Sequence, residues 1–376
     1  MSGMTAAARV FAIGGDPGGA SALAGVIEWL RQEGRVEVTA FAYRQAASIW
    51  KSRGLAFDLV PEDISRQQSK DLLAASRAAL LLLGTSANDL DLEKLFLESA
   101  GDLGIRSLAV LDYWSNYRLR FARMGGELLL PDKIAVMDAR AYREMVAEGF
   151  PEERLVVTGQ PAFDRLRGLR DAFSDAGEIR RRVGAAPDAR LVVFASQPIG
   201  EVYGRDETAP GWLGYVESDV LDILVASLDQ IAEHQNVPIV LVIRPHPRED
   251  AAKFSSVRAR RIRLVLDRDV DAYELVMASD LLVGMNSILL LEASYLGAIA
   301  LSLQPGLVKA DCLPSNGVGP IKAVYRRDEA EATIESWLFD EEGRQRQRAE
   351  LVGIAVDGLA SRRVAELIYE MLQSTE

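Results

Sequence analysis

A proline-flanked histidine is the first residue whose surroundings suggest chemistry. The stretch IRPHPRED follows the apolar run VPIVLV, in a chain that contains only two histidines. Proline cannot donate to a strand ladder, so Pro245 and Pro247 predict that a strand ends here in a stiff loop. Arg244 and Arg248 flank His246, an arrangement that favours the binding of an anion. The alternative is a structural loop in which a backbone carbonyl satisfies the histidine.

Polar residues also follow two other apolar runs in this half of the chain. The run LLVG leads through Asn286 and Ser287 into a predicted helix that carries Glu292. The N–H groups and dipole of a helix N-terminus favour a phosphate near Ser287, and a glutamate is able to bind a ribose diol. Ser196 and Gln197 follow the run RLVVFA, where small or amide side chains allow a phosphate to approach. The alternatives are an N-cap serine, a helix glutamate and ordinary turn residues.

Aromatic and amide side chains follow an apolar run in the first half of the chain. The apolar run SLAVL is followed by Asp112, Tyr113, Trp114 and, two residues on, Asn116. Aromatic rings offer flat apolar faces and the polar groups offer hydrogen bonds, a combination that favours the binding of a sugar or nucleoside. Burial can tune a carboxylate towards a neutral pKa, so Asp112 is a candidate general base. Gln160, in the turn of VTGQPAFD, is a further candidate contact. The alternatives are an aromatic cluster that packs a domain face, a helix cap at Asp112 and a plain turn or hinge at Gln160.

A glycine-rich loop, IGGDPGGAS, lies between the first predicted strand and the first predicted helix. Glycines let a backbone approach a ligand closely, and the following helix N-terminus offers N–H groups. The spacing is not GxGxxG and no P-loop lysine follows, so neither a dinucleotide nor an NTP site is expected. We expect the loop to line a binding cleft on the acceptor side; the alternative is a glycine-rich turn that caps a helix. Its candidate residues are Gly14, Gly15, Asp16, Gly18 and Gly19.

Short apolar runs alternate with helical patterns along the chain. Such strands are typical of parallel sheets that helices cover on both faces. The pattern restarts, which predicts two doubly wound α/β domains, 1–165 and 166–376, with ligands at strand ends and in the cleft between them. The last helix, 360–372, either completes the second domain or crosses back to the first. The predicted strands are 9–14, 36–41, 56–60, 78–84, 107–111, 133–137, 154–159, 190–196, 237–243, 262–266, 280–284 and 298–302.

The composition excludes several classes of function. The chain has 376 residues and a net charge of −12 without a basic stripe of useful size, so nucleic acid is not an expected partner. The single cysteine, Cys312, permits no internal disulfide and no cysteine-based zinc site, and two distant histidines make a metal site unexpected. Neither a signal peptide nor an apolar run of about 18 residues is present, which predicts a cytoplasmic protein without a transmembrane segment.

These motifs together resemble those of the GT-B glycosyltransferases. The similarity is closest to bacterial surface-polysaccharide enzymes with an HP motif, the sialyltransferases and CDP-glycerol glycerophosphotransferases, and to the UDP-GlcNAc 2-epimerases. In the HP-motif families the motif helps to bind the nucleotide phosphate, which implies this role for His246 and Pro247. The resemblance likewise implies that Ser287 binds phosphate and that Glu292 binds ribose. VTGQPAFD is similar to the T-G-x-P-x-x-D stretch at the domain junction of the glycerophosphotransferases and epimerases.

The resemblance implies an α/β fold of the GT-B class, in which two Rossmann-like parallel-sheet domains face a cleft. The N-terminal domain would take the acceptor and the C-terminal domain the nucleotide-sugar donor. The implied activity is a metal-independent glycosyltransferase of bacterial surface glycan or glycoprotein synthesis, with a glycan, lipid-linked or protein acceptor and no cofactor. Arg244, His246 and Ser287 would stabilise the leaving phosphate. The HP-type loop favours a cytidine nucleotide, and a CMP-linked nonulosonic acid is one candidate donor.

Some family motifs are absent, and this keeps other activities open. The HRREN-type loop of the epimerases is not reproduced, and their Asp-Ser-Gly-Gly turn reads Asn286-Ser287-Ile288-Leu289 here. The Asp/Glu-Asp-Gly base motif of several sialyltransferase families is also missing, so only its position supports Asp112 as the base. A nucleotide-sugar 2-epimerase or hydrolase is the second interpretation. A non-catalytic protein that binds nucleotides or sugars is the third.

Overall fold

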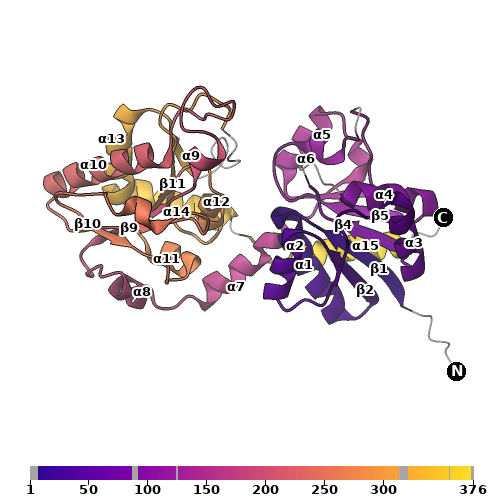
Figure 1. Ribbon diagram of the computed structural model, residues 1–376. Coiled ribbons are helices and arrows are strands. Elements are labelled where there is room, and N and C mark those ends of the chain that lie inside the picture. Colours follow the sequence, from indigo (N-terminus) through magenta and orange to yellow (C-terminus); the bar gives the residue numbers. More distant parts are fainter. Residues whose placement is uncertain are drawn as a thin grey trace. The chain divides into compact units, whose positions relative to one another are not determined.

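The chain divides into two compact units, each built around its own parallel sheet (Figure 1). The first unit comprises Met1–Arg165 together with Asp357–Glu376, and the second comprises Leu166–Val356. The prediction of two Rossmann-like α/β domains is therefore confirmed. Cys312 lies outside the described residues. The computed structural model describes residues 7–86, 92–123, 126–311, 313, 321–354 and 356–373.

The sheet of the first unit has the order β3-β2-β1-β4-β5-β6-β7, and all of its strand pairs are parallel. The order reverses between β1 and β4, which is the switch point of a doubly wound sheet. Loops that follow these two strands diverge there and leave room for a ligand. The strands are β1 (Ala8–Gly14), β2 (Val36–Ala42), β3 (Asp58–Leu59), β4 (Leu80–Leu83), β5 (Arg106–Val110), β6 (Lys133–Val136) and β7 (Leu155–Val157).

Helices cover both faces of this sheet because alternate side chains of its strands point to opposite faces. Val10 packs in the cluster that holds α1, whereas Phe11 stacks on Phe41 at 4.3 Å and on Phe96 of α4 at 5.3 Å between ring centroids. The helices are α1 (Pro17–Glu33), α2 (Gln45–Ser52), α3 (Arg66–Ser76), α4 (Leu92–Leu103), α5 (Tyr117–Phe121), α6 (Ala139–Ala147) and α15 (Ala360–Gln373), with the 3-10 turns η1 (Glu152–Arg154) and η2 (Pro161–Phe163).

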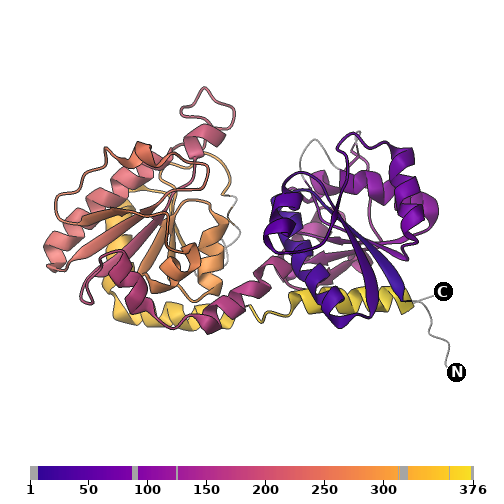
Figure 2. The same cartoon turned by 60° about the horizontal axis from the view of Figure 1, so that its bottom comes forward.

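The last helix, α15, packs in the first unit (Figure 2). Its apolar side chains share a core with α1, and Ile368 is fully buried there. Asp164 accepts hydrogen bonds from the N–H groups of Ala360 at 2.9 Å and Ser361 at 2.6 Å, so it satisfies donors that a helix start leaves without partners. Arg363 adds a hydrogen bond of 2.6 Å to the Thr158 carbonyl.

The sheet of the second unit repeats the same winding, in the order β10-β9-β8-β11-β12-β13. All pairs are again parallel, and the switch point lies between β8 and β11. The strands are β8 (Arg190–Ala195), β9 (Ile239–Arg244), β10 (Arg263–Leu266), β11 (Leu281–Gly284), β12 (Ala300–Leu303) and β13 (Lys322–Val324).

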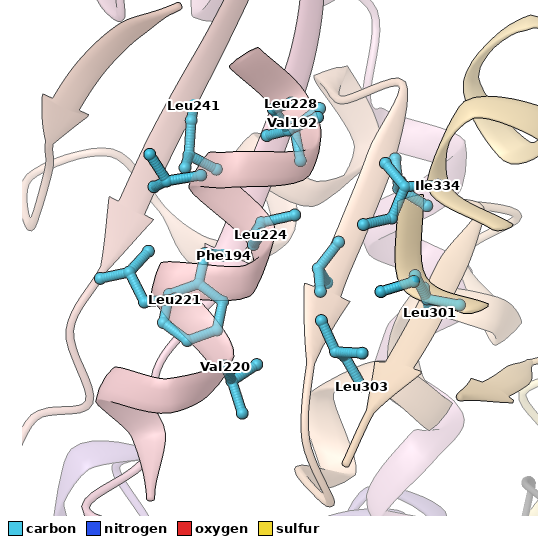
Figure 3. Packing of buried hydrophobic residues seen from close by; sticks show 14 of the residues in the cluster. Val192, Phe194, Val220, Leu221, Leu224, Leu228, Leu241, Leu301, Leu303 and Ile334 are labelled. Carbon is cyan, nitrogen blue, oxygen red and sulfur yellow. The ribbon is translucent and has the colours of Figure 1, made fainter. Parts of the chain in front are cut away.

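Two apolar layers cover this second sheet. On one face, Leu224 of α10 and Ile334 of α13 pack on Phe194 and Leu301 of the strands (Figure 3). On the other face, α8, α11 and α12 pack on the alternate strand residues. The helices are α7 (Asp164–Ala172), which starts in the first unit, α8 (Ala176–Arg182), α9 (Ile199–Val202), α10 (Glu217–Gln235), α11 (Ala272–Ala278), α12 (Ile288–Tyr295), α13 (Arg327–Phe339) and α14 (Glu341–Ile354), with the 3-10 turn η3 (Ala251–Phe254).

The sequence-based strands agree with the structure except at sheet edges. The strand β13 was not predicted, because it has only three residues and begins with an exposed lysine rather than an apolar run. The predicted strand 56–60 shortens to Asp58–Leu59, both exposed, at the edge of the first sheet. Edge strands bury less apolar surface, so their sequence pattern is weaker.

Replacement of Asp164 by alanine tests the anchoring of α15. We expect the free energy of unfolding to fall by about 1 kcal/mol, the usual loss when a side chain that satisfies helix N-terminal N–H groups is removed. Urea unfolding followed by circular dichroism measures this. Asp171→Ala is the control, because Asp171 is exposed and makes only surface ion pairs. Equal stabilities of the two variants would contradict the anchoring role.

A pair of glycine substitutions tests the packing of the loop after β1. A Cβ atom at Gly15 would lie 2.0 Å from Cζ of the buried Tyr43, whereas a Cβ atom at Gly101 of α4 would meet nothing within 4 Å. We expect Gly15→Ala to lower the unfolding free energy by about 1–3 kcal/mol through overpacking. Gly101→Ala should raise it by about 0.5–1 kcal/mol, because alanine favours a helix interior. Thermal and urea unfolding of both variants give the comparison.

Candidate functional site

A pocket of about 550 Å³ lies at the switch point of the second sheet. Its walls come from the loops that follow β8, β9, β10 and β11, all of which leave the carboxyl edge of the sheet. This is where doubly wound sheets bind ligands. The pocket brings together most of the residues that the sequence proposed for phosphate and ribose. Its lining residues are Ala195, Ser196, Arg244, Pro245, His246, Pro247, Arg268, Ala272, Tyr273, Ser287, Leu289 and Glu292.

The loop after β9 fixes the ring of His246. The backbone N–H of Arg248 donates to Nδ1 of His246 at 3.2 Å, so the neutral ring carries its hydrogen on Nε2. Partial burial lowers the pKa of His246 below its ordinary value, and the Arg248 guanidinium lowers it further, against the field of Glu249. The imidazole is therefore neutral at pH 7 and offers an N–H donor rather than a charge.

A buried carboxylate, Glu249, holds this loop in place, and the sequence analysis did not select it. Its side chain is fully buried; one oxygen accepts the backbone N–H of His246 at 2.7 Å and the other accepts the Ser196 hydroxyl at 3.0 Å. Lys253 forms an ion pair with Glu249 and a second one, of 2.9 Å, with Glu217. The sequence does contain a signal for this support: Glu249 lies three residues after His246, and Lys253 lies four residues after Glu249.

The pocket has a second arginine, Arg268, beside the expected Arg244. The guanidinium of Arg244 pairs with Asp267 at 2.8 Å, and both side chains are largely buried, so its charge is compensated within the protein. Arg268 also lines the pocket and donates to the carbonyl of Glu249. Among the described residues Arg268 has no ion pair. The role of Arg244 as a phosphate contact stays a prediction, and Arg268 is a further candidate that the sequence analysis did not select.

The start of α12 contributes a serine and a glutamate to the pocket. Ser287 is the N-cap residue, and its hydroxyl accepts the N–H of Leu289 at 3.2 Å, as a capping serine does. Glu292 is 8% exposed and accepts a hydrogen bond of 3.1 Å from the hydroxyl of Tyr273 on α11. The structural alternative for Ser287 is thus realised, and its location in the pocket leaves the phosphate role open as well.

Gln197 and Asn286 join the two loops of the switch point rather than line the pocket. The Gln197 amide donates to the Asn286 side chain at 2.9 Å and accepts the Asn286 backbone N–H at 3.2 Å. This reciprocal pair ties the loop after β8 to the loop after β11. The pair thus has a structural role, and the expected role of Gln197 and Asn286 as phosphate contacts stays a prediction.

The first unit has a second polar cluster at its own switch point. Asp112, after β5, accepts the Thr85 hydroxyl at 2.7 Å and forms an ion pair with the buried Arg120. Burial raises the pKa of the Asp112 carboxyl above its ordinary value, although Arg120 and Thr85 favour the charged form. A Cβ atom at Gly18 would lie 1.9 Å from Oδ2 of Asp112, so the glycine loop covers this carboxyl directly.

The glycine loop is held by another buried acid that the sequence analysis missed. Glu93 of α4 is 2% exposed and accepts hydrogen bonds from the N–H of Gly15 at 3.1 Å and from the hydroxyl of Ser86 at 3.2 Å. It also accepts a hydrogen bond from Tyr43. Asp16 is the N-cap of α1, without a capping side-chain hydrogen bond. Gly14 and Gly19 pack closely on neighbouring atoms; a Cβ atom at either would have contacts of 3.2 Å.

The aromatic residues after β5 are mainly structural. Trp114 is 7% exposed, donates to Asp138 at 2.8 Å and stacks on Phe163, so it packs within the first unit; its role in binding a sugar stays a prediction. Tyr113 packs edge-on against Trp114. The Gln160 amide donates to the carbonyl of Asp112 at 2.7 Å, which fixes the turn; its role as a ligand contact stays a prediction.

Asn116 is exposed and holds a left-handed backbone at the start of α5, with φ of 57°. Among the described residues no group of three His, Cys, Asp or Glu side chains is placed to hold a metal ion. No helix in the described part of the chain is long and apolar enough to cross a membrane.

Comparison with known proteins places the fold. No family model and no curated protein matches the sequence. Among solved structures, MnaA of S. aureus, determined with UDP, matches with a TM-score of 0.68 and 16% identity over 98% of each chain. The UDP-GlcNAc 2-epimerase of Neisseria meningitidis, bound to UDP-GlcNAc, matches with a TM-score of 0.65 and 14% identity over 96% of this chain and 100% of that chain.

A glycosyltransferase-type neighbour is also similar. MurG of Acinetobacter baumannii matches with a TM-score of 0.61 and 12% identity over 96% of this chain and 99% of that chain. Similarity at these identities establishes the fold and not the activity. The fold that the sequence motifs predicted is thereby confirmed: the chain has the GT-B fold.

Proposed function

We propose that this protein is a nucleotide-sugar enzyme that binds the nucleotide in the pocket of its second unit and transfers the sugar to an acceptor. The observation that carries the proposal is the convergence of His246, Arg268, Ser287 and Glu292 from three different segments on one pocket at a switch point. A cation, a neutral N–H donor and a helix N-terminus together bind phosphate, and a carboxylate binds a ribose diol.

The same groups would assist the departure of the nucleotide. When the bond between the sugar and the phosphate breaks, negative charge develops on the leaving phosphate. Arg268 and the Nε2–H of His246 would stabilise that charge, with the N-terminus of α12 at Ser287 as a third contribution. These groups are fixed before the substrate binds, which is what such stabilisation requires. No step of this scheme calls on a metal ion.

Uridine is the nucleotide we propose, in place of the cytidine that the HP motif favoured. MnaA was determined with UDP and the Neisseria epimerase with UDP-GlcNAc, and both align with nearly the whole chain. This likeness supports a UDP-sugar as the donor.

Asp112 of the first unit is the group we propose to accept a proton from the acceptor hydroxyl. Burial raises its pKa, and a raised pKa makes a carboxylate a stronger base. Its Oδ1 atom is engaged by Thr85 and Arg120, which leaves Oδ2, the oxygen that Gly18 of the glycine loop adjoins, to take the proton. The acceptor would be a glycan, lipid-linked or protein hydroxyl.

A nucleotide-sugar 2-epimerase or hydrolase is the second candidate function. It is favoured because several of the similar solved structures are UDP-GlcNAc 2-epimerases, whereas MurG represents the glycosyltransferases. This candidate needs the same nucleotide pocket but no acceptor. The two functions therefore differ in the products that form from the donor alone and in the need for an acceptor.

Calorimetric titration with UDP tests the pocket. We expect His246→Ala and Arg268→Gln each to weaken UDP binding about tenfold, the scale of one hydrogen bond to a charged group. CMP and CDP, titrated in parallel, should bind more weakly than UDP. His234→Ala is a matched control, because His234 is the other histidine of the chain and lies exposed on α10. Unchanged UDP affinity in both pocket variants would contradict the site.

Product analysis with UDP-GlcNAc alone, and then with added acceptor glycans, separates the candidate functions. Glycosyl transfer predicts little turnover of the donor alone and a new product with an acceptor, and Asp112→Asn should lower the transfer rate at least about 100-fold, the usual contribution of a general base. UDP-ManNAc formed from the donor alone would instead establish the epimerase. UDP binding without turnover under every condition would leave a binding protein.

A further inference from the structure

A second positively charged pocket lies at the opposite edge of the second sheet from the nucleotide pocket. Its volume is about 250 Å³, and its walls include Arg170 of α7, Arg344 and Arg348 of α14 and the carboxylate of Asp280. Asp280 directly precedes β11, so the pocket is at the amino edge of the parallel strands. We call it the amino-edge pocket.

Asp280 is the acid around which arginines gather. Its Oδ2 atom accepts the N–H of Leu191 at 2.8 Å and lies 3.2 Å from Arg180. Its Oδ1 atom lies 3.6 Å from Arg190 and 3.9 Å from Arg344. Three guanidinium groups thus share one carboxylate. The positive charge at this edge exceeds what Asp280 can compensate.

Arg344 is the most deeply buried of these cations, with 3% of its side chain exposed. Its Nη1 atom donates to the carbonyl of Asp280 at 3.2 Å and to that of Trp337, while its buried Nε has no hydrogen-bond partner among the described residues. Burial lowers the pKa of Arg344; Asp280 opposes this, and the guanidiniums of Arg348 and Arg190 add to it. Because arginine stays protonated in proteins, this crowding leaves a buried positive charge with incomplete compensation.

Two more arginines open onto the same pocket. Arg348 is exposed and, within the described part of the chain, has no ion pair or hydrogen bond. The ion pair that Arg170 forms among the described residues is with Asp171, at 3.6 Å and with both side chains partly exposed, and such a surface pair contributes little. The guanidiniums of Arg170 and Arg348 are therefore available to a ligand. Phe173 and Leu296 supply apolar surface beside them.

This excess of positive charge runs against the character of the whole chain. The protein carries a net charge of −12, and acidic surfaces repel anions in general. Arg180 and Arg344 have packing roles, because both donate to main-chain carbonyls. Arg348 has no such role. A concave cluster with free guanidiniums, a buried cation and an apolar wall is a recognition site for an anion rather than a general surface charge.

We propose that the amino-edge pocket binds the phosphate group of a phosphorylated molecule. Arg170 and Arg348 are the direct donors to the phosphate oxygens. Arg344 contributes its positive charge without donating to the phosphate, because its Nε atom is buried. The apolar wall fits the organic part of a phosphomonoester or of a lipid headgroup. This site is independent of the proposed nucleotide pocket, because the two lie at opposite ends of the same strands.

Titration with inorganic phosphate tests this site in a protein whose nucleotide pocket carries His246→Ala. We expect phosphate binding to persist in that variant and to weaken about tenfold when Arg170→Gln and Arg348→Gln are added together, the loss of a charge-assisted contact. Arg346→Gln is the control, because Arg346 lies on the same helix, is exposed and contacts Asp340 and Glu342 instead. It should leave phosphate affinity unchanged.

Sedimentation with phosphatidylglycerol vesicles distinguishes the source of the phosphate. Binding to vesicles that the Arg170→Gln/Arg348→Gln double variant loses assigns the pocket to a lipid headgroup. Binding of free phosphate without vesicle binding assigns it to a soluble phosphorylated molecule. The Arg170→Gln/Arg348→Gln double variant is also made in the protein that keeps His246. Binding of UDP by this variant shows that the fold is intact. Equal phosphate affinity in the double variant and its parent, or no phosphate binding by the parent at all, would overturn the proposal.

Discussion

The parallel arrangement of both sheets is the constraint on which the remaining structure depends. Parallel strands place all of their carboxyl ends at one edge, and the reversal of strand order between β8 and β11 separates the loops that leave this edge. The pocket of the second unit occupies that gap. Its polar groups come from segments as distant in sequence as Ser196 and Glu292, so only the sheet brings them together.

Loops assembled in this way need internal support, and buried carboxylates supply it in each unit. Glu249 links the loop after β8 to the loop after β9 through Ser196 and His246, and Lys253 balances its charge. Glu93 holds the glycine loop of the first unit. Such charges are costly to bury unless they are paired and hydrogen-bonded. Each buried carboxylate therefore favours the one loop conformation that satisfies its hydrogen bonds.

The sequence predicted most strands and the location of the pocket, because apolar runs and the residues at their ends are local features. It did not predict which charges are neutralised inside the protein. Arg244 and Arg268 looked alike in the sequence, and only the pairing of β9 with β10 brings Asp267 against Arg244. The contacts of Trp114 with Asp138 and Phe163 are likewise tertiary, so the local sequence did not predict them. Edge strand β13 was too short to leave an apolar pattern.

The return of α15 to the first unit makes the second unit an insertion within it. During synthesis the ribosome delivers all of Leu166–Val356 before the residues of α15. Domains generally fold as units when their chain is available, so the second unit can fold while the first still lacks a helix. The apolar face around Ile27 of α1, which Ile368 covers, stays open until then. The unit that comes first in the sequence is thus the last to be completed.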